Sequence, residues 1–209
     1  MQEPDRVPVF FYMASCARIL HMDIDRNIQQ VALDNYLWGS SADDVTVGAA
    51  LDADGGVLHV RFSVSERELR RMVWEPNGKV WTDSCVEVFV KNTDSDEYSN
   101  FEFSATGAFL AAHGAGRRDR VRYSDQEREA VAVEVRILQN DNRRSRWVLD
   151  ASIDLVRIGI IPSAPHEIAF NLYKCGDGLQ RPHFLSLFDI PLESPDFHRP
   201  EFFHKAVIH

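Results

Sequence analysis

Long apolar runs, excess positive charge and an obvious leader are all missing from this 209-residue chain. No apolar run approaches the roughly 18 residues of a membrane-spanning helix, so no membrane span is predicted. The net charge of −9 argues against non-specific binding of nucleic acid, which needs a basic face. The N-terminus lacks the basic stretch and apolar region of a signal peptide. The sequence therefore favours the cytoplasm, or an extracytoplasmic location if a leader was removed.

Cysteine is scarce, with three residues at Cys16, Cys85 and Cys175. Three cysteines cannot all pair within one chain, and their apolar surroundings predict buried, reduced thiols. A Cys85–Cys175 bridge would require that the two strands bearing them be neighbours.

Helical patterns are also sparse. Ser65–Met72 begins with an N-cap residue and is expected to form one or two turns, and Asp154–Ile158, which ends at Gly159, is a second candidate. Short runs of alternating apolar and polar residues are common instead, and turn residues separate them. These runs cover residues 58–64, 101–103, 131–137, 147–153 and 168–172, with a last strand at 202–208.

This pattern predicts an all-β fold, an antiparallel β-sandwich of jelly-roll type with one or two short helices. The length of the chain predicts a single domain over residues 1–209.

The segment Trp81–Lys91 is the most informative part of the sequence. If it is extended throughout, alternation places Val86, Val88 and Val90 on a core face. The opposite face then carries Trp81, Asp83, Cys85, Glu87 and Phe89. An indole ring can stack on the apolar face of a sugar while carboxylates accept hydrogen bonds from its hydroxyls. The alternative interpretation is that Trp81 caps the core and the acids are solvated.

Five pieces of the chain, taken in order, resemble the carbohydrate-binding family 9-like proteins, which are related to the sugar-binding modules of xylanases. They lie at residues 81–90, 98–107, 170–177, 182–186 and 197–203. The resemblance implies a β-sandwich without catalytic activity that binds a mono- or oligosaccharide. It also implies two aromatic rings around the sugar, hydrogen bonds from a glutamate, an arginine and an asparagine, and calcium that stabilises the fold.

Carried over to this sequence, the resemblance assigns Trp81 as the first stacking ring and Glu87 as the carboxylate. Asn171 fits the amide, and Arg117 or Arg118 fits the guanidinium. The second stacking tryptophan, expected soon after Asn171, is absent. The remaining site candidates are Tyr173 or His183 as the second wall, and Asp83 as a ligand, a turn-former or an ion-pair partner.

Other tryptophans are assigned structural roles: Trp74 and Trp147 in the core or in loop packing, and Trp38 at an edge. No cofactor is predicted apart from structural calcium, for which the acidic loop Asn92–Glu97 is the candidate. His183, His198 and His204 match no common zinc spacing.

Three other functions compete with sugar binding. A glycoside hydrolase would need Asp83 and Glu87 as paired carboxylates, but four residues along one strand separate them by about 13 Å. A haem- or metal-binding sandwich would use Met13, Met22 and histidines. A structural domain with a degenerate site is the third.

Overall fold

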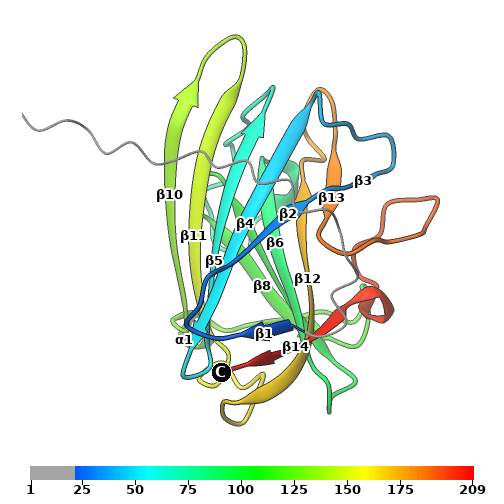
Figure 1. Cartoon of the computed structure of the whole chain (residues 1–209). Helices are drawn as coiled ribbons and strands as arrows, with labels where there is room; N and C mark the ends of the chain where they lie inside the picture. The colour runs from blue at the N-terminus through cyan, green and yellow to red at the C-terminus, as the bar shows by residue number, and fades with distance from the viewer. Residues whose placement is uncertain (1–21) are drawn as a thin grey trace, which may run out of the picture.

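The computed structural model describes residues 22–209, so Met13 and Cys16 lie outside the described residues. Strands dominate this part of the chain, and they form two packed layers (Figure 1). The alternating runs appear as strands with slightly wider bounds. They are β5 (Val57–Glu66), β7 (Tyr98–Ser104), β10 (Val131–Asn140), β11 (Ser145–Asp154), β12 (His166–Cys175) and β14 (His204–Ile208). The predicted all-β sandwich is confirmed.

One layer is a five-stranded antiparallel sheet in the order β10–β11–β5–β4–β2, where β4 is Val45–Asp54 and β2 is Gln29–Leu33. A two-residue hairpin joins β4 to β5. Its residues Gly55 and Gly56 have φ of 61° and 87°, a left-handed conformation that glycine adopts without steric cost. Alternate residues of β4 and β11 are buried, so one face of this sheet covers the core.

The other layer is a nine-stranded sheet in the order β1–β14–β12–β6–β7–β8–β9, and β13 extends it from β12 to β3. All of its pairs are antiparallel except β1 with β14. The remaining strands of this sheet are β1 (Met22–Ile24), β3 (Asn35–Leu37), β6 (Cys85–Asn92), β8 (Phe109–Gly114), β9 (Val121–Arg122) and β13 (Phe184–Ser186).

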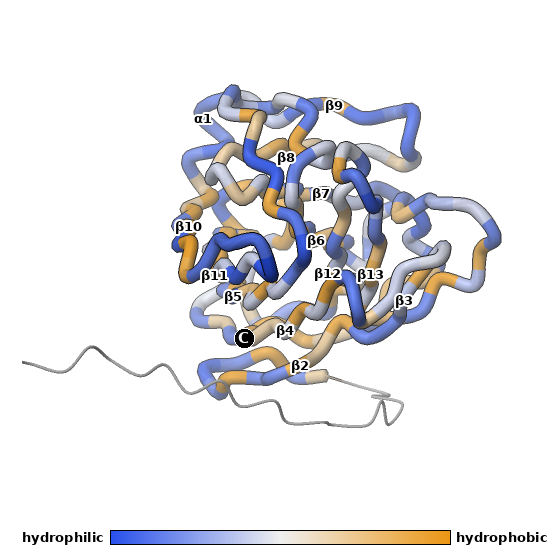
Figure 2. Tube along the Cα trace, turned by 90° about the horizontal axis from the view of Figure 1, so that it is seen from above, coloured by the Kyte–Doolittle hydropathy of each residue, from blue (hydrophilic) through white to orange (hydrophobic). Residues whose placement is uncertain are grey.

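The core lies between the two layers, which Figure 2 shows from above. Val86, Val88 and Val90 of β6 point into it, as the alternation predicted, and they share one buried cluster with Phe62 and Trp147 of the opposite sheet. Core or loop packing was predicted for both Trp147 and Trp74. Trp147 is fully buried in the core, whereas Trp74 is 64% exposed and lies outside it.

The outer face of the nine-stranded sheet is buried as well, because the chain after β13 folds back over it. Phe89, Tyr98 and Tyr173 from the sheet pack there with Phe197 and Phe203 from the returning segment. Every residue of β7 is buried, which shows that this sheet is covered on both faces.

The single-strand interpretation of residues 81–91 was partly wrong. Strand β6 begins only at Cys85, and Val80–Thr82 form a 3-10 turn, η1, before it. Trp81 and Asp83 therefore do not continue the face of Glu87 by simple alternation. The carboxylate of Asp83 accepts hydrogen bonds from the backbone N–H groups of Met72 and Val73, which ties the preceding segment to this turn.

The helix predicted over Ser65–Met72 is not formed, because Ser65 and Glu66 end β5 and the next residues are irregular. Asp154–Ile158 makes one turn, with an Ile158 N–H to Asp154 C=O bond of 3.0 Å. The α-helix α1 (Asp125–Arg128) begins at a capping box formed by Ser124 and Glu127, and η2 is Pro200–Phe202. No helix of residues 22–209 is long and apolar enough to cross a membrane.

Candidate functional site

A pocket of about 310 Å³ opens on the outer face of the nine-stranded sheet. We call it the outer-face pocket. Its aromatic lining comes from Trp38, Trp81, Phe184 and Phe197, and its polar lining includes Glu87, Asn100, Glu102, Arg117, Arg120 and Asp177. The floor is built by β6, β7 and β8, and the returning segment near Phe197 forms one side.

Two tryptophans from distant parts of the sequence line this pocket. Trp81 belongs to the η1 turn, and Trp38 follows directly after β3. The indole N–H of Trp38 donates a 2.8 Å hydrogen bond to the carbonyl of Leu192, and its ring centroid lies 5.5 Å from those of Phe184 and Phe197. These contacts fix the orientation of Trp38 while its ring stays half-buried at the pocket.

Two carboxylates lie side by side on the floor. Glu87 of β6 and Glu102 of β7 are directly opposite each other in the antiparallel register, and both are buried. Burial, the Cys175 thiol and the charge of Glu102 raise the pKa of Glu87 well above its usual range. Burial raises the pKa of Glu102 to about 7. Each of the two side chains has one buried oxygen, Oε2, without a hydrogen-bond partner in the protein.

Arg120 organises the neighbouring part of the floor. Its guanidinium donates hydrogen bonds to Asn100 Oδ1 and to the carbonyls of Tyr98, Ala112 and Gly114, and it lies 4.3 Å above the Tyr98 ring. Asn100 in turn donates a 2.8 Å bond to Glu102 Oε1. The buried Nε of Arg120 has no protein partner. Arg120, Asn100 and Glu102 therefore form one connected polar network at the pocket.

Three of the eight predicted site residues line the outer-face pocket: Trp81, Glu87 and Arg117. Arg117 is largely exposed and lies 3.4 Å from Asp196. Arg118 is exposed and does not line the pocket. Arg120, three residues after Arg117 in the same loop, was not among the predicted site residues, and only the fold brings its partly buried side chain to the pocket.

The other four predicted residues make structural contacts. Asn171 is fully buried, and its amide bonds to the backbone of Phe188 in both directions. Tyr173 is buried beneath Phe197, with stacked ring centroids 4.2 Å apart. Asp83 is buried and accepts bonds from Arg70 and Ser104 besides the backbone.

His183 is also buried, and it lies 3.2 Å from Glu66 in a different region of the molecule.

The sequence analysis assigned Trp38 to edge packing, because no local feature of the sequence links it to Trp81. The only usable sign was an aromatic residue followed by Gly39-Ser40-Ser41, a surface-turn composition.

The acidic loop Asn92–Glu97 stays a predicted calcium site, and two of its side chains bond within the protein. Asn92 Oδ1 accepts bonds from the N–H of Asp94 and from His166, and Glu97 bonds to His113. Within residues 22–209, the one close group of three metal-ligating side chains is Cys85, Glu87 and Cys175. Two sulfurs do not suit calcium, which takes oxygen ligands.

The fold is that of a β-sandwich module, and the comparisons with known proteins identify its family. The family model of carbohydrate-binding family 9 matches residues 18–208, so the chain belongs to that family. A search of curated proteins finds no match.

Solved structures give the same result. A protein from Bacteroides uniformis ATCC 8492, provisionally described as carbohydrate-binding, is 30% identical with a TM-score of 0.78, over 87% of each chain. A family 9 module from Caldicellulosiruptor kristjanssonii in complex with cellotriose is 10% identical, with a TM-score of 0.56 over 90% of this chain and 92% of the module. The same organism's module in complex with glucose is 12% identical, with a TM-score of 0.53 over 90% and 94%. At such identities the two modules show a shared fold.

Proposed function

We propose that this protein binds a sugar unit in the outer-face pocket without altering it chemically. The observation that carries this proposal is a set of three buried atoms without protein partners in residues that line the pocket: Glu87 Oε2, Glu102 Oε2 and Arg120 Nε. A buried polar atom without a hydrogen bond is costly, so such atoms mark the place of a polar ligand. Sugar hydroxyls both donate and accept hydrogen bonds, which suits carboxyl oxygens beside a guanidinium N–H.

The two tryptophans supply the apolar half of the recognition. Trp81 and Trp38 line the same pocket, and a pyranose ring has C–H faces that pack on indole. In this proposal Trp38 serves as the second stacking ring, which the family resemblance placed soon after Asn171. The sugar complexes of the two Caldicellulosiruptor modules support a mono- or oligosaccharide as the ligand class.

The arrangement of the acids supports binding rather than hydrolysis. Glycosidases place two carboxyl groups on either side of the scissile bond. Glu87 and Glu102 instead lie next to each other on one sheet and line one floor. Asp83, the other candidate acid, is bound to backbone N–H groups and does not line the pocket.

The proposal is tested by titrating glucose, xylose, galactose, cellobiose and xylobiose into the protein, with calorimetry and tryptophan fluorescence as readouts. Trp81→Ala and Trp38→Ala should each weaken binding by at least about tenfold, since each removes a stacking surface worth about 0.5–1.5 kcal/mol beyond its buried area. Trp74→Ala is the matched control, because Trp74 is exposed and does not line the pocket.

Saturable binding that both pocket variants weaken and the control retains would support the proposal. Binding of no sugar by the folded wild-type protein would refute it. Release of nitrophenol from nitrophenyl glycosides would contradict the non-catalytic part alone.

A further inference from the structure

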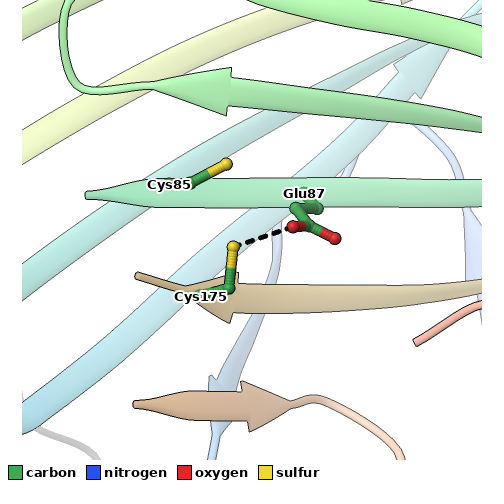
Figure 3. A group of neighbouring side chains, drawn as sticks. All are labelled: Cys85, Glu87 and Cys175. Carbon is green, nitrogen blue, oxygen red and sulfur yellow. Dashed lines mark hydrogen bonds between the residues drawn. The ribbon is translucent and has the colours of Figure 1, made fainter. Parts of the chain in front are cut away.

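Two cysteines and a glutamate meet beneath the outer-face pocket, and the strand register brings them together. Cys85 of β6 is directly opposite Cys175 of β12, and Glu87 lies two residues further along the same face of β6. Figure 3 shows the three side chains converging from these two neighbouring strands. Cys175 Sγ and Glu87 Oε1 are 2.9 Å apart, and the nearest ligand atoms of all three residues lie within 4.8 Å of one another.

The three side chains are buried but only weakly engaged. The two thiols form a hydrogen bond with each other, and each makes one longer contact of 3.7 Å, Cys85 to the carbonyl of Val86 and Cys175 to the carbonyl of Trp81. Glu87 is 3% exposed, and its Oε2 has no hydrogen-bond partner in the protein. The neighbouring groups that act electrostatically on this carboxyl are Cys175 first, then Glu102 and Asp177, and all three are acidic. A cation at this position would favour the ionised forms of the carboxyl and of the thiols.

We propose that Cys85, Cys175 and Glu87 form a binding site for one thiophilic divalent cation, with Zn²⁺ as the best fit. A tetrahedral ion with Zn–S bonds of about 2.3 Å and a Zn–O bond of about 2.1 Å needs sulfurs about 3.8 Å apart and S···O separations of about 3.6 Å. All three ligand atoms lie within 4.8 Å of one another, so small side-chain shifts reach this geometry, and the Cys175–Glu87 contact of 2.9 Å has to open by about 0.7 Å.

The site would have three protein ligands and one open position. Glu87 and Cys175 both line the outer-face pocket, whereas Cys85 is fully buried behind them. The fourth position of the ion therefore faces the pocket, where water or a ligand hydroxyl can occupy it. Binding breaks the two S–H bonds and the O–H bond of the Glu87 carboxyl, whose protons leave to solvent, and forms two metal–sulfur bonds and one metal–oxygen bond.

The ligand set selects among metals. Two sulfurs with one carboxylate favour zinc over calcium or magnesium, which take oxygen ligands. Both cysteines are free in the structure, so both sulfurs are available to the ion.

The test uses the full chain, reduced and freed of metal with a chelator, and Co²⁺ as a spectroscopic probe. We expect one equivalent of Co²⁺ to produce a near-ultraviolet thiolate-to-cobalt band and the intense visible absorption of a tetrahedral ion, and one equivalent of Zn²⁺ to remove both. Cys85→Ala and Cys175→Ala should lose the band. Glu87→Gln should keep thiolate absorption with weaker affinity. Cys16→Ala is the matched control and should behave like the wild type.

Absence of the thiolate band in the wild-type protein would overturn the proposal, and this result needs no variant. A band that survives in both Cys85→Ala and Cys175→Ala would place the ion elsewhere and would overturn it too. So would a Cys85–Cys175 disulfide found by mass spectrometry in protein purified without reductant. Near-ultraviolet circular dichroism confirms that each variant is folded. The metal titration contains no sugar, so failure to bind metal leaves the sugar-binding proposal unaffected. Failure to bind sugar likewise leaves the metal-site proposal unaffected.

Discussion

The buried ion pair between Glu66 and Lys174 offers a stringent test of how the two sheets are held together. Lys174 Nζ lies 3.0 Å from Glu66 Oε2, and both side chains are fully buried. Trp147 donates a 2.6 Å hydrogen bond to Glu66 Oε1, and His183 lies 3.2 Å from Oε2. Glu66 ends β5 and Lys174 belongs to β12, so the pair links one layer to the other.

Lys174→Met keeps most of the side-chain volume and removes the charge, which leaves the carboxylate of Glu66 without its cation. Breaking a buried ion pair in this way costs about 3–5 kcal/mol. The pKa of Glu66 gives a similar magnitude. Burial opposes its ionisation, yet Lys174, His183 and Trp147 hold its pKa at about 2 instead of 4.5. That difference corresponds to about 3 kcal/mol.

Urea and thermal unfolding, followed by circular dichroism at pH 7, measure the loss. At about 2–4 °C per kcal/mol for a chain of this size, Tm should fall by about 6–20 °C. The double variant Glu66→Gln with Lys174→Met should recover at least about 1 kcal/mol, because no unpaired charge remains.

The pH dependence gives an independent check. Because the folded-state pKa of Glu66 is lowered, its contribution is fully present above about pH 4.5 and is lost as pH falls toward 2. In Lys174→Met the Glu66 carboxyl becomes protonated at a higher pH than in the wild type. The difference in free energy of unfolding between the two proteins should therefore shrink as the pH is lowered from 7 towards 2. A loss below about 1 kcal/mol at pH 7, or an equal gap at pH 7 and pH 3, would refute this reasoning.

Three further predictions concern the pocket and its support. Arg120→Lys should weaken sugar binding by at least about tenfold in calorimetry, since a lysine cannot hold Asn100 and three backbone carbonyls at once; unchanged affinity would exclude a role for the network. Asp83→Ala should lower the free energy of unfolding in urea by about 1.5–3 kcal/mol, because charged hydrogen bonds to two backbone N–H groups are lost; a loss below about 1.5 kcal/mol would contradict this estimate. Arg117→Ala should weaken sugar binding while Arg118→Ala leaves it unchanged, since only Arg117 lines the pocket; the reverse order in the same titration would show that the loop is placed differently.

Local composition determined the architecture of this protein. Alternation along residues 58–64, 131–137 and 147–153 predicted strands because side chains on a strand point to opposite faces, whatever the strand pairs with. The pair of glycines at residues 55–56 indicated a turn because few other residues adopt its left-handed conformation, and the structure makes it a hairpin. The helix predicted over Ser65–Met72 does not form, because contacts with residues far away in the sequence hold both ends of the segment. Glu66 is buried against Lys174, and Asp83 accepts hydrogen bonds from the N–H groups of Met72 and Val73.

The site was predictable only where its parts are close in sequence. Trp81 and Glu87 lie six residues apart, and the composition of that segment was enough to single them out. Lys174 could also have been singled out from the sequence. It follows Phe170 and Leu172 on the inward-facing side of the strand, where a charged group needs a buried partner.

Only the tertiary structure decided the rest. Trp38, Glu102 and Arg120 reach the pocket through strand order and through the chain that returns after β13. The pairing of β6 with β12 places Cys85 opposite Cys175, although 90 residues separate them along the chain. No local pattern records such neighbours, because sheet register is set by how two faces pack against each other and against the opposite layer.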